Sequence, residues 1–415
     1  MKKFFLSLIS AFAVAPFLLA QGSLYSALGV GEPSHLPSSQ ASGMGYVGVA
    51  IAHPLYINRV NPATLSAISS TRIAGDLSYV GYAARGNLGS TFQAFGSFNG
   101  AGFAVPIWKA VFATGLYPYS RLDYNQRQMG RLELPETDTA TFEHRYRGIG
   151  GLSVVPLAIA FAPRHHRLKG TLRIGVSLNL LFGAMERTRE TFLNGADVPQ
   201  IENVVEERAS GRSFTLGVSY SKPRVFSQTD ALALGASFTT AATLDGERRD
   251  FLRGNGVADT LQSPTSNVAL PASLALGVAY FGEKHLFGID VVAQNWSRFQ
   301  YFGESGLARN SIRVGIGAEK QPDRDRRARL LDRLAYRAGA YYYQTPFRVS
   351  GVGIDEIGFT AGVGFPISGE LSRLDVNVEW AMRGSEKKNL VRENVFRLRF
   401  ALNAGELWFQ KRKIE

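Results

Sequence analysis

The sequence has 415 residues, 44 glycines and no cysteine, and its formal net charge at pH 7 is +12. Without cysteine, the chain has no disulfides, thiolate metal sites or thiol nucleophile. A pI of about 9.8 raises the question of nucleic-acid binding. The arginines are scattered singly along alternating segments, so we expect no nucleic-acid partner. They would instead line a lumen or meet anionic lipid headgroups.

The first twenty residues have the pattern of a secretory signal peptide. Lysines follow Met1, an apolar run extends from Phe4 to Ala20, and polar residues come next. A basic start, a short apolar stretch and a small residue at its end are typical of cleaved signals. The run is long enough for an uncleaved anchor, but Pro16 and Ala20 favour cleavage after Ala20. We therefore predict a signal peptide at residues 1–20.

Residues 21–70 differ from the rest of the chain. They are rich in Gly, Ser, Ala and Pro, and they show no sustained period. Their apolar residues, such as Tyr56 and Ile57, would be buried if this segment folded inside a wide barrel. We therefore predict an N-terminal plug, with a disordered periplasmic tail as the alternative. Gly43 to Gly48 matches G-x-G-x-x-G, but the flanking Ser and Pro residues exclude the strand and helix that a dinucleotide site needs.

From residue 71 onward, apolar residues recur at every second position. Leu172 to Phe182 and Leu374 to Trp380 alternate apolar residues with polar or small ones, which is the pattern of a β-strand with one apolar face. These segments are about ten residues or longer and carry aromatics near their ends, as membrane-barrel strands do. We count about 14 strands, near 71–84, 90–105, 110–122, 141–156, 171–190, 207–221, 231–243, 268–280, 285–297, 310–319, 334–344, 357–366, 373–382 and 393–403.

The connections between these segments alternate in length. Six long polar connections are expected outside the cell and short turns in the periplasm; the long ones lie near 123–140, 191–206, 244–267, 298–309, 345–356 and 383–392. The fold class predicted is all-β: a transmembrane antiparallel β-barrel at residues 71–404, with the plug in its lumen and a periplasmic tail at 405–415. The predicted location is the bacterial outer membrane.

No motif in the sequence indicates catalysis. His165 and His166 lie in a predicted turn without an acidic partner, so we expect a solvated turn and not a metal site. The Asn295-Trp296-Ser297 sequon is predicted to lie on a membrane strand, which argues against modification. We therefore expect no enzyme activity, metal or cofactor.

Two pairs of arginines are the candidates for ligand contacts. Arg145 and Arg147 share one face of a predicted strand, and Arg187 and Arg189 share one face of the next. Paired guanidiniums can hold a carboxylate or phosphate. The alternative, which we favour, is a cross-strand charge ladder with neighbouring glutamates: Glu143, Glu186 and Glu190.

Several segments together resemble the FadL-type family of outer-membrane transporters of long-chain fatty acids and other hydrophobic compounds. They are Ser42–Gly45 with Asn61-Pro62-Ala63, Leu270–Tyr280 followed by Asp290 and Asn295–Phe299, and Tyr336–Tyr342. The ending Glu406–Lys413 is similar to the Bacteroidetes-type branch. The resemblance implies a plug that acts as a gate, formed by Gly43, Met44, Gly45, Gly48, Asn61, Pro62 and Ala63. It also implies a kinked early strand that opens to the bilayer, which Gly96, Gly100 and Gly102 would permit.

We therefore predict a passive transporter of hydrophobic small molecules such as long-chain fatty acids, gated by the plug. The alternative is a FadL-like barrel that does not transport, acting as a protein-secretion shuttle, an adaptor or a structural protein. The partners expected are outer-membrane lipid and lipopolysaccharide, a hydrophobic ligand, and barrel-assembly machinery during biogenesis. A monomer is expected.

Overall fold

The computed structural model describes residues 22–407 except 36, 88, 134–138, 164–168, 196, 198, 200, 255–256, 263–264, 324, 326, 369–370 and 387–389. The predicted signal peptide, His165 and His166 and most of the predicted tail therefore lie outside the described residues. Within the described part, no helix is long and apolar enough to cross a membrane.

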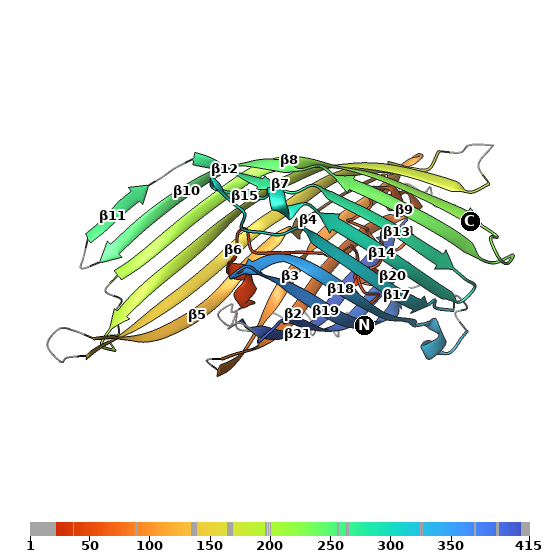
Figure 1. Cartoon of the computed structure of the whole chain (residues 1–415). Coiled ribbons are helices and arrows are strands. Elements are labelled where there is room, and N and C mark those ends of the chain that lie inside the picture. Colours follow the sequence, from red (N-terminus) through yellow and green to blue (C-terminus); the bar gives the residue numbers. More distant parts are fainter. Residues whose placement is uncertain are drawn as a thin grey trace, which may run out of the picture.

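The described chain forms one closed antiparallel β-barrel of 14 strands (Figure 1). Each strand pairs with its neighbours in sequence, and β2 closes the ring by pairing with β21 from Thr71↔Glu406 to Arg85↔Arg392. Because the first residue of β2 lies opposite the last residue of β21, both ends of the barrel chain lie at one end of the barrel. We call this the terminal end, and the opposite end the loop end.

Ten barrel strands are single segments: β2 (Thr71–Gly86), β3 (Gly89–Ile107), β6 (Thr139–Phe161), β7 (Thr171–Leu193), β8 (Ile201–Pro223), β17 (Ser311–Lys320), β18 (Ala335–Val349), β19 (Val352–Ser368), β20 (Ser372–Gly384) and β21 (Arg392–Glu406). The other four are broken by a short irregularity: β4 (Ala110–Pro118) with β5 (Ser120–Glu133), β9 (Ala231–Thr239) with β10 (Ala242–Gly254), β12 (Thr265–Leu270) with β13 (Ser273–Phe281), and β14 (His285–Gln294) with β15 (Gln300–Tyr301). The short strands β11 (Val257–Gln262) and β16 (Glu304–Ser305) extend this sheet at the loop end.

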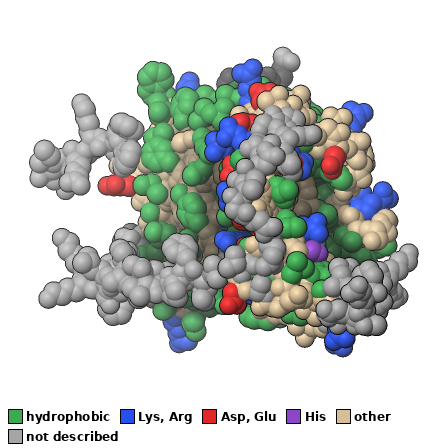
Figure 2. Space-filling model, turned by 90° about the vertical axis from the view of Figure 1, so that its left-hand side faces the viewer, with side chains coloured by type: hydrophobic (Ala, Val, Ile, Leu, Met, Phe, Trp, Pro, Cys, Tyr) green, Lys and Arg blue, Asp and Glu red, His purple; other side chains and the backbone are tan. Residues whose placement is uncertain are grey.

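The outer face of the wall is apolar. On β13, Leu274, Leu276 and Val278 are 45%, 49% and 44% exposed, while the alternate residues Ala275 and Ala279 are buried. Hydrophobic side chains gather on a flank of the barrel in the view of the loop end (Figure 2). The alternation seen in the sequence therefore turns its apolar side towards lipid and its polar or small side towards the lumen.

Three predicted loops are in part strand. β5 runs to Glu133, β8 begins at Ile201, and β10 runs to Gly254, so the connections placed at 123–140, 191–206 and 244–267 are shorter than predicted. These extensions project beyond the other strands (Figure 1). In these extensions, charged residues stand at the alternate positions that are apolar in the rest of each strand. Residues of opposite charge face each other on neighbouring strands, as Arg145 and Glu190 do. The missing apolar pattern made these extensions resemble loops.

The described residues of the N-terminal segment, 22–35 and 37–70, lie inside the barrel. It contains η1 (Leu24–Ala27), β1 (Glu32–Pro33), α2 (Ser39–Ser42) and η2 (Pro62–Ala67). Its side chains and backbone contact inward-facing residues of strands around the ring, from Asp123 on β5 to Glu393 on β21. The backbone groups of this irregular segment are therefore satisfied by the wall and not by water.

Candidate functional site

A belt of glycines on the inner wall receives the N-terminal segment. A Cβ at Gly339 would lie 2.2 Å from the Gly45 nitrogen, and a Cβ at Gly317 would lie 2.3 Å from the Met44 oxygen. Other inward-facing glycines around the ring likewise leave no space for a Cβ. Together we call these residues the glycine belt: Gly175, Gly217, Gly235, Gly277, Gly315, Gly317 and Gly339. Only glycine lets two backbones approach so closely.

The predicted glycine motif of the N-terminal segment lies against this belt. Gly43 follows α2, and Met44 is fully buried. Gly45 has a φ of +61°, which favours glycine, and its N–H donates to Thr360 Oγ1 at 2.8 Å. The G-x-G-x-x-G pattern therefore serves close packing of backbone against backbone.

Asp290 anchors the same segment from β14. Its Oδ2 accepts hydrogen bonds from the N–H groups of Gly48 and Val49 at 2.5 and 2.7 Å, and the residue is only 4% exposed. A carboxylate that accepts two backbone N–H groups satisfies donors that would otherwise be buried without partners.

The Asn-Pro-Ala turn is a second anchor. The Asn61 side-chain oxygen accepts the Ala63 N–H and caps η2, while its Nδ2 donates to the carbonyls of Val49 and Val218 at 2.8 and 3.1 Å. Pro62 follows at the first turn of η2, where its missing N–H costs nothing. A single buried asparagine thus joins two parts of the N-terminal segment to β8.

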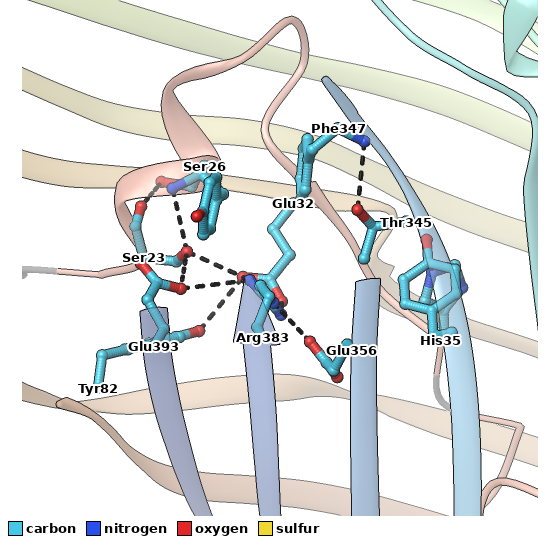
Figure 3. Close-up of polar contacts among 12 residues, drawn as sticks. Ser23, Ser26, Glu32, His35, Tyr82, Thr345, Phe347, Glu356, Arg383 and Glu393 are labelled. Atoms are coloured by element: carbon cyan, nitrogen blue, oxygen red, sulfur yellow. Dashed lines mark hydrogen bonds and ion pairs between the residues drawn. The ribbon is translucent and has the colours of Figure 1, made fainter. Parts of the chain in front are cut away.

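Arg383 on β20 is the centre of a buried ion-pair cluster near the start of the N-terminal segment (Figure 3). Its guanidinium pairs with Glu32 and with Glu356, and it lies 3.8 Å from a carboxylate oxygen of Glu393. Glu393 also accepts hydrogen bonds from Ser23 Oγ and the Leu24 N–H at 2.7 and 2.9 Å. Burial acts to raise the pKa of Glu32, but Arg383 and Arg397 outweigh it and hold that pKa at about 2.

Two further networks lie deeper in the lumen. Tyr46 donates to Glu379 at 2.5 Å and accepts from Arg399 at 2.7 Å. Towards the terminal end, Arg337 pairs at 2.6 Å with Glu319 and at 2.6 Å with Asp375. Many arginines of this basic chain are thus paired inside the barrel, and removing one partner would leave a buried charge unpaired.

The wall has an unpaired seam beside β3. In the described part of the chain, β3 pairs with β4 only from Ala101↔Leu116 to Ile107↔Ala110, and β5 pairs with β6 and β1 instead. Arg121 bridges the seam by donating to Ser97 Oγ and to the Phe98 carbonyl.

The predicted kink glycines lie on the β3 side of this seam. Gly100 has a φ of +116°, and the β2–β3 register shifts beside it. Gly96 has open space around its Cα, whereas a Cβ at Gly102 would meet Tyr117. That these glycines let the wall open remains a prediction.

The interior cavities near the middle of the barrel are small. One of about 110 Å³ lies behind the seam and is lined by Glu32, His35, Phe95 and Arg121 among others, and a second has about 200 Å³. Pockets for drug-sized ligands are typically about 300–1,000 Å³. A wider cleft of about 780 Å³ opens at the loop end between β3 and β5.

Protein side chains fill the apolar space below the loop-end strands. Val30 of the N-terminal segment packs into a cluster whose other buried members come from the wall and from the β14–β15 connection: Leu122, Tyr124, Leu152, Leu181, Met185, Ala209, Ala242, Leu244, Val268, Leu270, Trp296, Phe299 and Tyr301. We call this the upper apolar cluster. A packed cluster of this kind is a hydrophobic core and not an open pocket.

The two candidate arginine pairs lie on opposite faces of the sheet. Tyr146 stands opposite Arg189 and Arg145 opposite Glu190, so Arg145 and Arg189 point to different sides. Arg145 pairs at 2.8 Å with Glu143, two residues away on the same strand, and not across strands as in the predicted ladder. Arg187 is half-buried and pairs with Glu207 and Tyr301, and Arg147 is exposed. The two pairs do not meet in one site, and ligand contact by either stays a prediction.

The sequence reasoning missed two features of the lumen. In the sequence, the glycines of the belt appear only as small residues that alternate with apolar ones along each strand. Which glycines lie side by side on neighbouring strands depends on the strand register. The buried pairs, such as Arg383 with Glu32, join residues 351 positions apart. No local pattern predicts which charges meet at that separation.

Solved structures share this fold. The chain is similar to the CymD monoaromatic hydrocarbon channel (TM-score 0.55, 14% identity, covering 94% of this chain and 100% of that chain). It is similar to the toluene transporter TbuX of Ralstonia pickettii (TM-score 0.54, 17% identity, covering 89% of this chain and 98% of that chain). It is also similar to a FadL homologue of Pseudomonas aeruginosa (TM-score 0.56, 13% identity, covering 89% of this chain and 98% of that chain). A comparison with curated proteins gives no match.

The fold predicted from the sequence, a FadL-type barrel of the bacterial outer membrane, is therefore confirmed. At these identities the similarity concerns the fold alone. The sequence profile of the BamG family matches residues 1–415, the whole chain. This protein belongs to the BamG family, and its own fold is that of the FadL-type channels.

Proposed function

We propose that this protein is a non-transporting accessory barrel of an outer-membrane assembly machinery. The observation that carries the proposal is the filled lumen. The upper apolar cluster fills the lumen below the loop-end strands with protein side chains, and Val30 of the N-terminal segment is part of it. A barrel with a packed core is suited to holding partners and not to passing solutes.

The family assignment also supports a role in outer-membrane assembly. The prefix of the name BamG is the one given to components of barrel-assembly machinery, and the family profile covers the whole chain. The projecting strands β5 to β8 and β10 give the barrel a polar sheet beyond the membrane, which is a surface that a partner can use.

Depletion of the protein tests this role. We expect the amounts of folded outer-membrane barrels to fall together, as measured by the heat-dependent mobility of several barrels on gels, while an outer-membrane lipoprotein that needs no barrel folding stays constant. The tagged protein, extracted in mild detergent, should copurify in a fixed ratio with the central barrel subunit of the machinery. Unchanged amounts of folded barrels after depletion would exclude the accessory role.

A second function, passage of hydrophobic small molecules with the N-terminal segment as the gate, is favoured by the seam. The 780 Å³ cleft, the unpaired edge of β3 and the 110 Å³ cavity follow one another from the loop end inward. CymD and TbuX, which share the fold, are described as a hydrocarbon channel and a toluene transporter. Long-chain fatty acids are one ligand class that this route could serve.

Uptake measurements separate the two functions. Partial depletion that leaves other barrels intact should lower the uptake of labelled toluene or oleate only if this protein is the channel. Uptake equal to that of undepleted cells across both compounds would exclude the transport function for them.

A further inference from the structure

A cavity of about 410 Å³ opens at the terminal end of the barrel. Three arginines from three different elements line it: Arg72 on β2, Arg373 on β20 and Arg333 at the end of η4 (Leu330–Arg333). His53 of the N-terminal segment lies at the same cavity. The loop-end clefts and the arginine pairs of β6 and β7 lie at the other end of the barrel, so this is a separate place in the molecule.

Two of these arginines have buried nitrogens without partners. Arg72 is only 1% exposed, and its Nη1 donates a hydrogen bond to the Leu371 carbonyl. Among the described residues, nothing accepts a hydrogen bond from Arg72 Nε, Arg72 Nη2 or Arg373 Nη1. An unpaired buried guanidinium is costly, because it has lost its water without gaining a partner. Such a group is explained when a ligand supplies the missing acceptor.

The carboxylates near the cavity are already engaged. Glu319 accepts from Arg337 Nε at 2.6 Å and from Gln40 at 2.9 Å. The exposed Asp323 accepts the Asp325 N–H at 2.9 Å within its own turn. Asp375, just beyond the cavity, is held by Arg337, Ser39 and Asn403. The cavity therefore keeps an excess of positive charge.

His53 adds a neutral donor. Its Nδ1 accepts the Leu55 N–H at 3.1 Å, so the proton of the neutral ring is on Nε2. Burial, followed by the nearby Arg337 and Arg373, lowers the pKa of His53 to about 3. The ring stays neutral at ordinary pH and can donate one hydrogen bond from Nε2.

We propose that this terminal-end cavity binds a phosphate group, carried by a phospholipid headgroup or by a soluble phosphate ester. The donors come from four segments of the chain that line the same cavity: β2, β20, η4 and the N-terminal segment. Several guanidinium groups together can supply the hydrogen bonds that the oxygens of one phosphate group accept. The cavity is larger than inorganic phosphate and has apolar walls at Phe281 and Leu286, which leaves room for the organic part of an ester. The proposal is independent of the accessory role.

Binding is tested on the full-length mature protein in a zwitterionic detergent. Inorganic phosphate and glycerol 3-phosphate are titrated at constant ionic strength and followed by calorimetry and by the melting temperature. We expect saturable binding that is about tenfold weaker in Arg373→Gln, since one set of charge-assisted hydrogen bonds is lost. Arg85→Gln, an exposed arginine at the loop end, is the matched control and should bind as the unaltered protein does.

Arg72→Met supplies a second readout. Because it removes an unpaired buried charge, this variant should melt at the same or a higher temperature than the unaltered protein without phosphate, and phosphate should no longer raise its melting temperature. No phosphate response in the unaltered protein, or equal responses in it and in Arg373→Gln, would overturn the proposal.

Native mass spectrometry of the membrane-extracted protein identifies the source of the phosphate. A phospholipid adduct that is lost in Arg373→Gln indicates a lipid headgroup. Binding of glycerol 3-phosphate without any lipid adduct indicates a soluble ester.

Discussion

Arg383 shows how a single buried side chain holds the N-terminal segment in place. The residue comes from β20, but its partners come from the N-terminal segment, β19 and β21. It is 2% exposed, so its charge depends on these carboxylates and not on water. A buried cluster of this kind favours one arrangement of the segment, because any displacement separates charges in a medium that screens them poorly.

Replacing Arg383 by glutamine should therefore be strongly destabilising. We expect Arg383→Gln to lose about 3–5 kcal/mol of unfolding free energy, since Glu32, Glu356 and Glu393 would be left buried with too little positive charge. The measurement is urea unfolding in lipid vesicles, followed by tryptophan fluorescence. The control is Arg85→Gln, whose exposed pair with Glu386 is 3.9 Å long and should contribute less than about 1 kcal/mol. Equal losses in both variants would contradict the role given to Arg383.

The N-terminal segment should also lose stability in acid. The pKa of His53 is lowered to about 3, so below pH 6.5 the unfolded chain binds a proton that the folded chain does not. The pKa of Glu32 is lowered to about 2, and its contribution, present above pH 4.5, is lost as the pH falls towards 2. Unfolding free energies measured between pH 7 and pH 3 should fall with pH. His53→Gln should remove the fall between pH 6.5 and 4.5, where Glu32 does not yet contribute, and make the curve shallower between pH 4.5 and 3, where only the contribution of Glu32 is left.

At the scale of elements, each strand uses its alternating residues to contact lipid on one face and the N-terminal segment on the other. The outward residues meet lipid, and inward-facing glycines lie where the backbone of the N-terminal segment approaches the wall most closely. Gly277 on β13 and Gly315 on β17 alternate with exposed apolar residues such as Leu276 and Val314. The glycines weaken the strands as isolated elements, but they allow contacts between two backbones that a larger residue would prevent.

Adding one methyl group to the glycine belt tests this explanation. In Gly339→Ala the new Cβ would lie 2.2 Å from the Gly45 nitrogen, so the N-terminal segment has to move. We expect a loss of about 1–3 kcal/mol and faster tryptic cleavage at Arg59, the only Lys or Arg between residues 22 and 70. Gly96→Ala is the matched control, because nothing lies within 4 Å of its new Cβ. Cleavage at the same rate in both variants would show that the belt does not hold the segment.

The order and approximate bounds of the strands could be predicted from the sequence. A strand near 357–366 is β19 at Val352–Ser368, and one near 285–297 is β14 at His285–Gln294. The predictions were too short for β5, β8 and β10, which extend into water. Apolar alternation identifies a strand only where one face meets lipid or a core, so the polar extensions carried no such pattern.

At the scale of the whole molecule, the barrel and its contents form one packed unit. The N-terminal segment contacts β7 and β8 through its Asn-Pro-Ala turn, β14 through Asp290, and β20 and β21 through Arg383 and Glu393. Removing the segment from the lumen would break all these contacts at once. The accessory function needs no such movement, whereas passage through the lumen does.

A reversible lock distinguishes these functions in one protein. A Cβ at Gly277 would lie 2.8 Å from that of Val49 and 2.3 Å from Asp290 Oδ1, and disulfides need a Cβ–Cβ distance of about 3.5–4.5 Å. Both the N-terminal segment and the Asp290 side chain therefore have to shift for the bond to form, and the single variants control for that shift. The chain has no other cysteine to interfere. We expect the oxidised Val49→Cys, Gly277→Cys variant to support barrel assembly as fully as the two single variants do. Assembly or hydrophobic uptake that is blocked by oxidation and restored by a reductant would instead assign the function to a moving gate.

The sequence by itself determined the class of the fold. Apolar residues at every second position indicate strands with one apolar face, and segments of about ten residues with aromatics near their ends indicate strands that cross a membrane. The irregular residues 21–70 needed a wall to satisfy their backbone groups. The glycines and the Asn61-Pro62-Ala63 turn were recognisable because close packing and a capped turn are local properties. Recognising them did not require knowing which residues of the barrel wall they contact.

Only the tertiary structure decided what fills the lumen. Register aligned the glycine belt, paired Arg383 with Glu32, and turned the Arg145 and Arg187 pairs to opposite faces. It also brought Arg72 and Arg373 to one cavity without partners for all their nitrogens. These contacts join residues hundreds of positions apart, and a shift of one residue in any strand would reverse which side chains face the lumen. The alternation of apolar and polar residues in the sequence determines that each strand has two different faces. Only the closed barrel determines which residues of different strands meet in the lumen.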